Sequence, residues 1–413
     1  MESRPVVPAG DLNRLRQINE LAVLDVVRGG GPMRLSEIAD QTSLTRATVR
    51  EVVSGLQDKG WVAAEAPVVA GRGRPAQRFR FRTEAGCVLG LDIGAHSIDA
   101  AVADLGGAIL GHAHQRPTAR TPASERLALV GRAVRESIAD AGITADQVWV
   151  TVAGSTGRLA PDGSVLASAA IPDWSGLNLV DRLAPLTPGT LVVENDVRLA
   201  TLAEQRIGAA RGARDVVVVQ AGRRVGMGLV LDGQLRLGAG GVAGDVSRFS
   251  ALNCEYAIDY IGRCATLPSG GTTGDHVQDV LIAAREGQSA AVDAVRQYAR
   301  VVAEAVATTV SLLDPEMVVL TGTMAAAAAI VVPILVAEIK LRCLRTPAVA
   351  ASEFGSTAVM YGAIQKGVGH LIDTLLGAGN NAVPPLQPLS DRSHVDGPGA
   401  RWVSLRVDGS MSS

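Results

Sequence analysis

Three segments decide the fold of this chain: LVVEND (residues 191–196), VVVVQAGRRVGMGLVLDG (216–233) and GAGGVAGDVSRF (238–249). The first is an apolar strand that carries Asn195 and Asp196 to its end. The second predicts a buried strand, a glycine-rich turn and another strand. The third is a loop whose glycines let the backbone turn tightly around a small ligand. A carboxylate at a strand end that faces a glycine-rich loop is typical of a phosphoryl-transfer site, because loop amides hold phosphates and the carboxylate accepts a proton.

Two arginines interrupt this pattern. Arg223 and Arg224 lie in the turn where a phosphate needs small residues. The segments therefore indicate either a kinase site or a sugar sensor derived from one.

Composition limits the remaining possibilities. With 413 residues, 47% hydrophobic and 19% charged, the chain is expected to form two or three globular domains. The net charge of −2 excludes a surface that is basic throughout, so any nucleic-acid site must be local. The four cysteines show no paired spacing and the first 14 residues have no apolar core, which favours a cytoplasmic protein without a signal peptide.

Residues 317–337 carry no charge and are long enough to cross a membrane. Gly322 and Pro333 interrupt the run, so a buried strand, a turn and an alanine-rich buried helix are the preferred interpretation.

The first 85 residues have the spacing of a helix–turn–helix. A first helix should turn Leu15, Ile18, Ala22 and Val26 inward, and Ser36 should cap a short second helix. Thr45 should cap a third helix that buries one apolar face, made of Val49, Val52, Val53 and Leu56.

The outward face of the third helix carries the residues expected to meet DNA. Arg46, Thr48 and Arg50 lie near its N-terminal end, where base edges and phosphates of the major groove are contacted. After Gly60, residues 61–84 read as two strands around a basic turn, which is a wing. The predicted DNA-binding residues are Thr45, Arg46, Thr48, Arg50, Arg72 and Arg74. The alternative for the wing is a solvated hairpin in an arginine-rich protein.

Residues 86–375 contain the same pattern of predicted strands twice. Antiparallel strands open the region at VLGLDIG, and a similar set begins about 125 residues later, which suggests an internal duplication with a cleft between two lobes. Residues 376–413 are rich in Pro, Gly, Ser and Asn and should form a mostly disordered tail, in which RWVSLRV (401–407) is one candidate docking strand.

An ordered set of motifs carries a family resemblance. In chain order they are TRATVREVVSGLQDKGWV (45–62), GRGRP (71–75), LDIG (91–94), IPDWSG (171–176), VENDVRLATLAE (193–204), GLVLDGQLRLGAGGVAGD (228–245) and LLDPEMVVLTG (312–322). Together they resemble the ROK family of repressors and sugar kinases, within the actin-like ATPase superfamily, and its branch of winged-helix transcriptional regulators. The resemblance implies an α/β fold: a winged helix–turn–helix followed by a two-lobed domain for an effector and for oligomerisation.

The phosphate motifs depart from the kinase pattern. The resemblance places phosphate loops at Asp92 and Gly94 and at Gly222, Gly226 and Gly228, but His96 replaces a threonine of family kinases. In the second loop, Arg223 and Arg224 replace a threonine and a glycine, which removes freedom for positive φ and fills the space for a phosphate. We therefore expect no ATP-dependent catalysis and no cofactor, with Asp196 as a vestigial base.

For the effector, the resemblance implies contacts from Asn195, Asp196, Asp173, Asp245 and Arg248. The alternative for Asn195 and Asp196 is that they merely cap the following helix. Arg248 replaces the family's zinc-binding histidine, which motivates the hypothesis of an anionic effector such as a sugar phosphate; a closed pocket, with Arg248 paired to Asp245 or Glu255, is the alternative.

No metal is expected. The family's cysteine cluster is missing, and Cys254, Cys264 and His276 lack the number and spacing of zinc ligands.

The sequence thus predicts a cytoplasmic, sequence-specific regulator, most simply a repressor, that binds operator DNA as a homodimer or homotetramer and responds to a sugar or sugar phosphate. Two alternatives stay open: an active sugar kinase with an appended DNA-binding module, and a regulator without a ligand.

Overall fold

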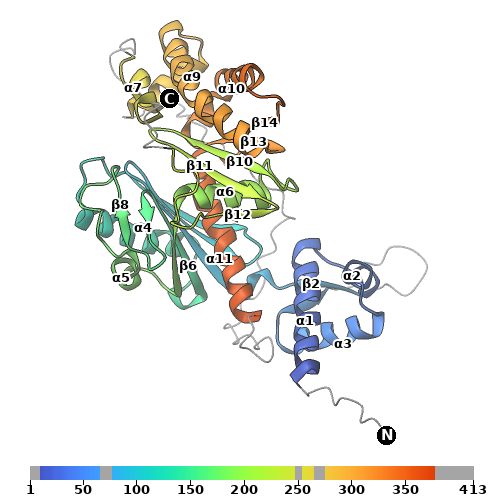
Figure 1. The fold of residues 1–413 in the computed structure, drawn as a ribbon. Coiled ribbons are helices and arrows are strands. Elements are labelled where there is room, and N and C mark those ends of the chain that lie inside the picture. The colour runs from blue at the N-terminus through green and yellow to red at the C-terminus, as the bar shows by residue number, and fades with distance from the viewer. Residues whose placement is uncertain (1–9, 66–76, 247–253, 265–274, 377–413) are drawn as a thin grey trace.

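The computed structural model describes residues 10–65, 77–246, 254–264 and 275–376. Figure 1 shows a small N-terminal module beside two larger lobes, each built on a five-stranded sheet.

The N-terminal module is a winged helix–turn–helix. It contains α1 (Gly10–Gly30), α2 (Leu35–Thr42), α3 (Arg46–Asp58) and the antiparallel strands β1 (Val62–Glu65) and β2 (Arg78–Phe81). The predicted cap of α3 is confirmed, because the Thr45 hydroxyl accepts a hydrogen bond from the Thr48 amide at 3.2 Å. All four residues predicted for the inner face of α3 are buried.

Two predictions for the first helices are wrong. Leu15 and Ile18 are 55% and 52% exposed, whereas Val23, Leu24 and Val27 are buried. The buried face of α1 also contains Glu20, a carboxylate that accepts hydrogen bonds from Lys59 Nζ at 2.9 Å beyond the end of α3.

The second helix begins one residue before the predicted cap. Arg34 is the N-cap residue, and its amide donates to the Glu37 carboxylate at 2.8 Å, so Ser36 lies within the first turn of α2. Ile38 and Ala39 of this helix are buried.

The two lobes have the same sheet topology. In the first lobe the strand order is β5-β4-β3-β6-β9, and in the second it is β12-β11-β10-β13-β14. Each sheet combines an antiparallel three-stranded meander with two further strands in parallel. The internal duplication predicted from the sequence is therefore confirmed at the level of topology.

The strand bounds in the first lobe are β3 (Cys87–Ile93), β4 (Ile98–Asp104), β5 (Ile109–Gln115), β6 (Val148–Ser155), β9 (Thr190–Asn195) and the small hairpin β7 (Arg158–Leu159) and β8 (Val165–Ala167). Those in the second lobe are β10 (Val216–Ala221), β11 (Val225–Leu231), β12 (Gln234–Arg236), β13 (Met317–Thr321) and β14 (Ala348–Ala351).

The helices of the lobes are α4 (Ala123–Asp140), α5 (Leu179–Leu183), α6 (Asp196–Ile207), α7 (Ala257–Gly262), α8 (His276–Arg285), α9 (Ser289–Leu313), α10 (Ala328–Arg342) and α11 (Ala358–Leu376). The first sheet is covered by α4 on one face and by α11 on the other, while α9 packs on the second sheet. Although α11 follows the second lobe in sequence, it runs beside α6 and the first sheet (Figure 1). The contact with α6 is close, since a Cβ at Gly362 would lie 1.8 Å from the Leu199 carbonyl oxygen.

The apolar run near residue 330 forms a strand, a turn and a helix, as predicted, but the helix is buried on one face only. Val331, Leu335 and Ile339 of α10 are buried, and Leu341 is 78% exposed. By length and composition alone, Thr323–Arg342 is the one helix among the described residues that could cross a membrane, with a mean hydropathy of 2.1. A single helix of this kind is a weak indication, because core helices of soluble proteins pass the same test.

One apolar core joins the N-terminal module to the first lobe. Trp61 stacks on Phe81, with ring centroids 6.1 Å apart, and meets Trp149 of β6 edge to face at 6.1 Å. Only residues 82–86 separate β2 from β3, and the predicted boundary at residue 85 falls within the short 3₁₀ turn Thr83–Ala85. The recognition helix is therefore held against the first lobe by packing and by a short connection.

Removal of this contact should destabilise the whole chain. Trp61 is 2% exposed, so Trp61→Ala deletes a large buried ring and is expected to lower the free energy of unfolding by about 3 kcal/mol. Urea unfolding followed by circular dichroism measures the change. The matched control is Leu166→Ala, whose side chain is 56% exposed. Equal losses in the two variants would contradict a joined core.

Candidate functional site: an interlobe site and a DNA-facing helix

Asn195 and Asp196 lie where β9 ends and α6 begins. The Asn195 Oδ1 atom accepts from the Arg198 amide at 3.2 Å, which makes Asn195 the N-cap of α6. Its Nδ2 donates to the Gly157 carbonyl and to Asp196 Oδ1, both at 3.0 Å. The capping role is therefore real, and Asn195 also fixes the loop after β6.

Burial changes the acidity of two carboxyl groups here. Desolvation raises the pKa of Asp196 to about 6, although the Val197 amide and the charge of Arg224 lower it. Desolvation also raises the pKa of Asp92 well above its usual range, and the charges of Asp99 and Asp196 add to this. Near neutral pH the two groups therefore carry less negative charge than two exposed aspartates would.

The turn between β10 and β11 is tight. The Gly222 amide donates to the Arg224 carbonyl at 3.0 Å, and the Gly222 carbonyl accepts from the Tyr298 hydroxyl at 2.9 Å. Arg223 forms an ion pair with Asp275 at 2.6 Å. Both arginines are exposed at this turn.

The backbone at Arg223 and Arg224 needs no glycine. The non-glycine residues with positive φ in the described part of the chain are Ser43, Asp173, Asp232 and Asp314, so Arg223 and Arg224 adopt ordinary conformations. The neighbouring glycines serve packing, because a Cβ would lie 2.7 Å from Val197 at Gly226 and 1.7 Å from Thr201 at Gly228. The space that the arginine side chains occupy is the remaining reason to expect no phosphate cradle.

His96 brings the first loop to this turn. Burial lowers the pKa of His96, the charges of Arg223 and Arg126 lower it further, and Asp275 opposes them. The loop after β3 and the turn after β10 thus lie within electrostatic reach of each other. We call His96, Arg223, Arg224, Asp92 and Asp196 the interlobe site.

An ion-pair network connects this region to the glycine-rich loop. Arg198 donates to the Gly241 carbonyl at 2.5 Å and to Glu194 at 3.0 Å. Lys366 of α11 donates to the other oxygen of Glu194 at 3.0 Å. Desolvation is the largest single effect on Glu194 and raises its pKa. The positive charges of Lys366 and Arg198 and the hydrogen bond from the Asn195 amide together outweigh it, so the pKa of Glu194 is lowered.

The other predicted effector residues are less clearly assembled. Asp173 is exposed, has φ +55° and forms no hydrogen bond or ion pair within the described ranges. Its neighbour Trp174 is buried and donates from Nε1 to the Ser155 hydroxyl at 2.9 Å. Asp245 is exposed, and Arg248 lies outside the described residues.

The predicted DNA-binding residues divide into three groups. Arg46 and Arg50 are exposed on α3, whereas the hydroxyls of Thr45 and Thr48 lie 2.8 Å apart and bond to each other. Arg72 and Arg74 fall in the part of the wing that the structure does not describe.

At the base of the wing, Arg80 and Arg82 pair with Glu84 at 2.9 and 3.5 Å. Arg78 donates to the Pro32 carbonyl at 2.9 Å. These three arginines of the basic run are thus engaged within the module.

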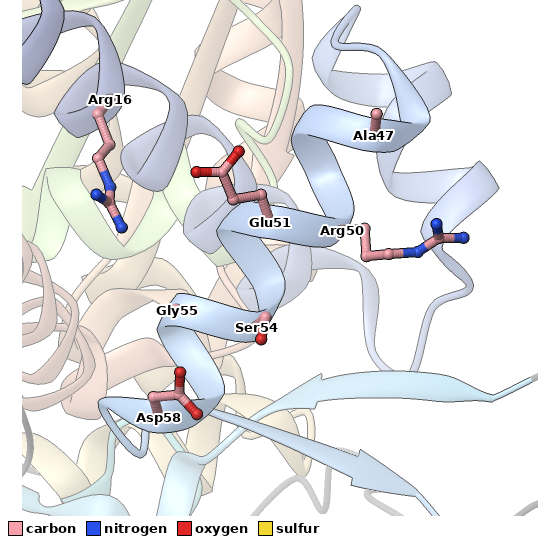
Figure 2. Close-up of a pocket in the computed structure, with 7 residues that line it drawn as sticks. All are labelled: Arg16, Ala47, Arg50, Glu51, Ser54, Gly55 and Asp58. Carbon is pink, nitrogen blue, oxygen red and sulfur yellow. The ribbon is translucent and has the colours of Figure 1, made fainter.

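The structure adds residues that the sequence prediction missed. An open groove of about 490 Å³ runs along α3 and α1 (Figure 2). It is lined by Arg16, Ala47, Arg50, Glu51, Ser54, Gly55 and Asp58. The buried face of α3 does not include Ala47, Glu51 and Ser54, which follow one another at intervals of four and three residues. The helical periodicity that predicts the buried face therefore also identifies these residues.

No group of three or more potential metal ligands occurs in the described ranges. Cys254 and Cys264 are buried, and burial raises the pKa of Cys254 to about 11, which disfavours the thiolate that zinc requires. His276 directs Nε2 toward the Ile261 carbonyl at 3.2 Å.

Comparison with known proteins gives two family matches. The ROK family profile matches residues 88–250 and 271–365, and the IclR helix-turn-helix domain profile matches residues 20–66.

Individual relatives include both regulators and kinases. The DNA-binding transcriptional dual regulator NagC of Escherichia coli (strain K12) is 22% identical over 370 residues, which cover 81% of this chain and 88% of the relative. A glucokinase of Streptomyces coelicolor is 28% identical over 266 residues, or 57% of this chain and 82% of the enzyme. The crystal structure of a ROK family transcriptional regulator, a homologue of the E. coli MLC protein, has a TM-score of 0.68 at 23% identity and covers 88% of this chain and 98% of its own.

The raised pKa of Asp196 predicts a specific pH dependence of stability. Because the folded state holds a proton between about pH 4 and pH 6 that the unfolded state releases, stability should fall as the pH rises through that window. Asp196→Asn removes this pH dependence: between pH 4 and pH 7 the wild-type chain should lose about 2–3 kcal/mol of unfolding free energy that the variant keeps. Denaturant titrations at several pH values measure it.

The control for this test is Asp293→Asn, whose carboxylate is 68% exposed. If the free energy of unfolding has the same pH dependence in Asp196→Asn and in the wild-type chain, the assignment of a desolvated carboxyl group is contradicted.

Proposed function

This chain belongs to the ROK family, and we infer that it is a sequence-specific transcriptional regulator whose kinase-like domain senses a sugar or sugar phosphate. The observation that carries this function is the winged helix–turn–helix, in which the exposed Arg46 and Arg50 lie on the outward face of a well-capped α3. Residues 1–85 form the DNA-binding domain in this proposal, residues 86–375 the effector and oligomerisation domain, and residues 376–413 a tail.

The proposed DNA contacts follow from side-chain chemistry. Arg46 and Arg50 donate to guanine edges or phosphates of the major groove, and Ala47 offers a methyl contact to thymine. Glu51 can accept from the amino group of cytosine. Arg72 and Arg74 at the wing would reach a minor groove or the backbone. Since one module reads one half-site, we propose a symmetric dimer or tetramer that represses transcription in the cytoplasm.

The proposed effector site lies around Asn195 and Asp196. Amide and carboxylate oxygens at a strand end suit the hydroxyl groups of a sugar. Asp173, Asp245 and Arg248 are the further proposed contacts.

An active sugar kinase is the second candidate function. Asp196 with a pKa of about 6 is suited to act as a general base near neutral pH, and glucokinases are among the relatives. Against this, Arg223 and Arg224 occupy the turn where phosphates would bind, and we propose that catalysis is absent. Sugar-dependent ADP release that disappears in Asp196→Ala would establish the kinase instead.

The ion-pair network offers a route from effector to DNA. Glu194 links Arg198, and through it the Gly241 loop, to Lys366 on α11.

Farther along α6, Arg206 donates at 2.8 Å to the carbonyl of Gln365, the residue of α11 that precedes Lys366. Burial lowers the pKa of Arg206, the charge of Arg28 on α1 lowers it further, and Asp373 and Asp25 oppose them. The α6–α11 pair thus spans from the glycine-rich loop to the first helix of the DNA-binding module, and we propose that effector binding shifts this pair.

Substitutions on α3 test the DNA-binding function. Arg50→Ala should weaken binding to the specific operator by about 1–3 kcal/mol, roughly 5- to 150-fold, because a groove contact is lost. Fluorescence anisotropy with DNA from upstream of the protein's own gene measures the affinity, with a scrambled duplex alongside. Arg285→Ala, an exposed arginine on α8, is the matched control. Full operator affinity in both Arg46→Ala and Arg50→Ala would remove the assignment of α3 as the recognition helix.

A substitution on α11 tests the coupling. Lys366→Gln leaves Glu194 paired to Arg198 but cuts the link to α11, so a sugar or sugar phosphate that changes operator affinity in the wild type should change it far less in the variant. The expected loss is about 1 kcal/mol or more of coupling free energy. Effector affinity measured by calorimetry without DNA should stay near the wild-type value, whereas the difference between effector affinities with and without operator DNA should shrink by the same coupling free energy. An undiminished response in Lys366→Gln would contradict the route.

A further inference from the structure

The groove between α1 and α3 contains a glycine that packing does not explain. Gly55 lies in the interior of α3, where glycine is among the least favourable residues because it gives the unfolded chain more freedom. Its φ is not positive, and a Cβ added to it would meet nothing within 4 Å. The missing side chain instead leaves open space on the wall of the groove, as the close approach of a ligand requires.

Arg16 supplies a positive charge on the α1 side of the same groove (Figure 2). Its side chain is 64% exposed, and its Nε lies 3.8 Å from Glu20 Oε1, which is too far for a hydrogen bond. The two oxygens of the buried Glu20 accept from Lys59 Nζ, each at 2.9 Å. Glu20 therefore attracts Arg16 by charge without taking a hydrogen bond from its Nε, and the guanidinium can donate to an anion in the groove.

Two carboxylates limit where an anion can lie. Glu51 and Asp58 also line the groove, about one helical turn before and one turn after Ser54 and Gly55. Both are exposed and repel phosphate groups, so a DNA strand cannot follow the groove along its whole length. Between them, Ser54 offers a hydroxyl donor and Gly55 has no side chain. A strand can therefore cross the groove at this one turn, where there is room for a single phosphate group.

We propose that this groove seats one phosphate group of the operator backbone, which Arg16 binds through its guanidinium and Ser54 through its hydroxyl, while Gly55 leaves the room. The inference rests on the proposed function and adds a residue of α1 to the DNA contacts of α3. Arg50 lines the groove as well, so the backbone contact lies beside the proposed base contacts. Phosphate contacts position a helix–turn–helix on the duplex, and they carry no sequence information of their own.

The salt dependence of DNA binding tests the contribution of Arg16. Each phosphate contact adds about 0.9 to the slope of log K against log salt concentration, so Arg16→Ala should lower that slope by about 0.9. In salt of about 0.1 M the change is a roughly eightfold loss of affinity. Fluorescence anisotropy with the full chain should show the same loss for DNA from upstream of its own gene and for a scrambled duplex. Arg16→Lys should restore most of the slope, and Arg285→Ala on α8 is the control.

Gly55 is tested against a matched glycine of the same domain. Gly55→Gln introduces a better helix former, so its urea midpoint should be no lower than that of the wild type. The new side chain should nevertheless block the phosphate and weaken DNA binding about as much as Arg16→Ala, with no further loss in the double variant. Gly29→Gln is the control, because Gly29 lies in α1, has no positive φ and would also meet nothing within 4 Å. This variant should bind DNA like the wild type.

Three results would overturn the proposal: an unchanged salt slope in Arg16→Ala, wild-type affinity in Gly55→Gln, or a loss confined to operator DNA, which indicates a base contact. The wild-type chain separates this inference from the proposed function. If it prefers operator DNA and the variants match it, only the phosphate contact is removed. If it binds both duplexes equally and Arg16→Ala still lowers the slope, only the sequence-specific regulator is removed.

Discussion

The contact of Trp61 with Phe81 and Trp149 is the constraint on which the rest of the structure depends. A winged helix–turn–helix on a long linker would sample many orientations, and no change in a distant domain could direct it. Here the apolar core is continuous from α3 through the wing into the first sheet, and α11 packs into the same core. The orientation of the recognition helix is thereby a property of the whole first lobe.

The α6–α11 pair gives that arrangement a functional meaning. The N-terminus of α6 carries Asn195 and Asp196, and its later turns contact α11, whose far end lies near α1. A ligand that changes the position of α6 by a small amount has a packed helix through which the change can reach the DNA-binding module, because interiors are close-packed and transmit displacement. A kinase-like domain can take a regulatory role in this way. Asp196 keeps its position at the end of β9, while the turn between β10 and β11, which binds phosphates in the kinase pattern, carries Arg223 and Arg224.

The sequence was sufficient where local rules dominate. The burial of Val49, Val52, Val53 and Leu56 followed from helical periodicity, Thr45 capped its helix as expected, and the repeated strand pattern foretold two sheets of equal topology. It failed where tertiary contacts decide. The buried face of α1 includes the pair of Glu20 with Lys59, residues 39 positions apart, and no local pattern predicts that a carboxylate there is buried and paired.

The site was predicted in the same uneven way. The strand end at Asn195 and Asp196 was found from sequence, but the buried charge of Arg126 and the pairing of Arg223 with Asp275 depend on packing between distant segments. The glycines at 226 and 228 were assigned to a phosphate loop, and the structure shows that contact with α6 already requires them.

The proposed regulator binds a specific DNA sequence, and a small molecule bound in its kinase-like domain alters that binding. Both properties can be measured together by a footprint of the purified protein on DNA upstream of its own gene, repeated with a panel of sugars and sugar phosphates. We expect protection of a site with two-fold symmetry, whose midpoint concentration shifts with at least one compound. Protection without sequence preference, unchanged across the panel, would contradict it.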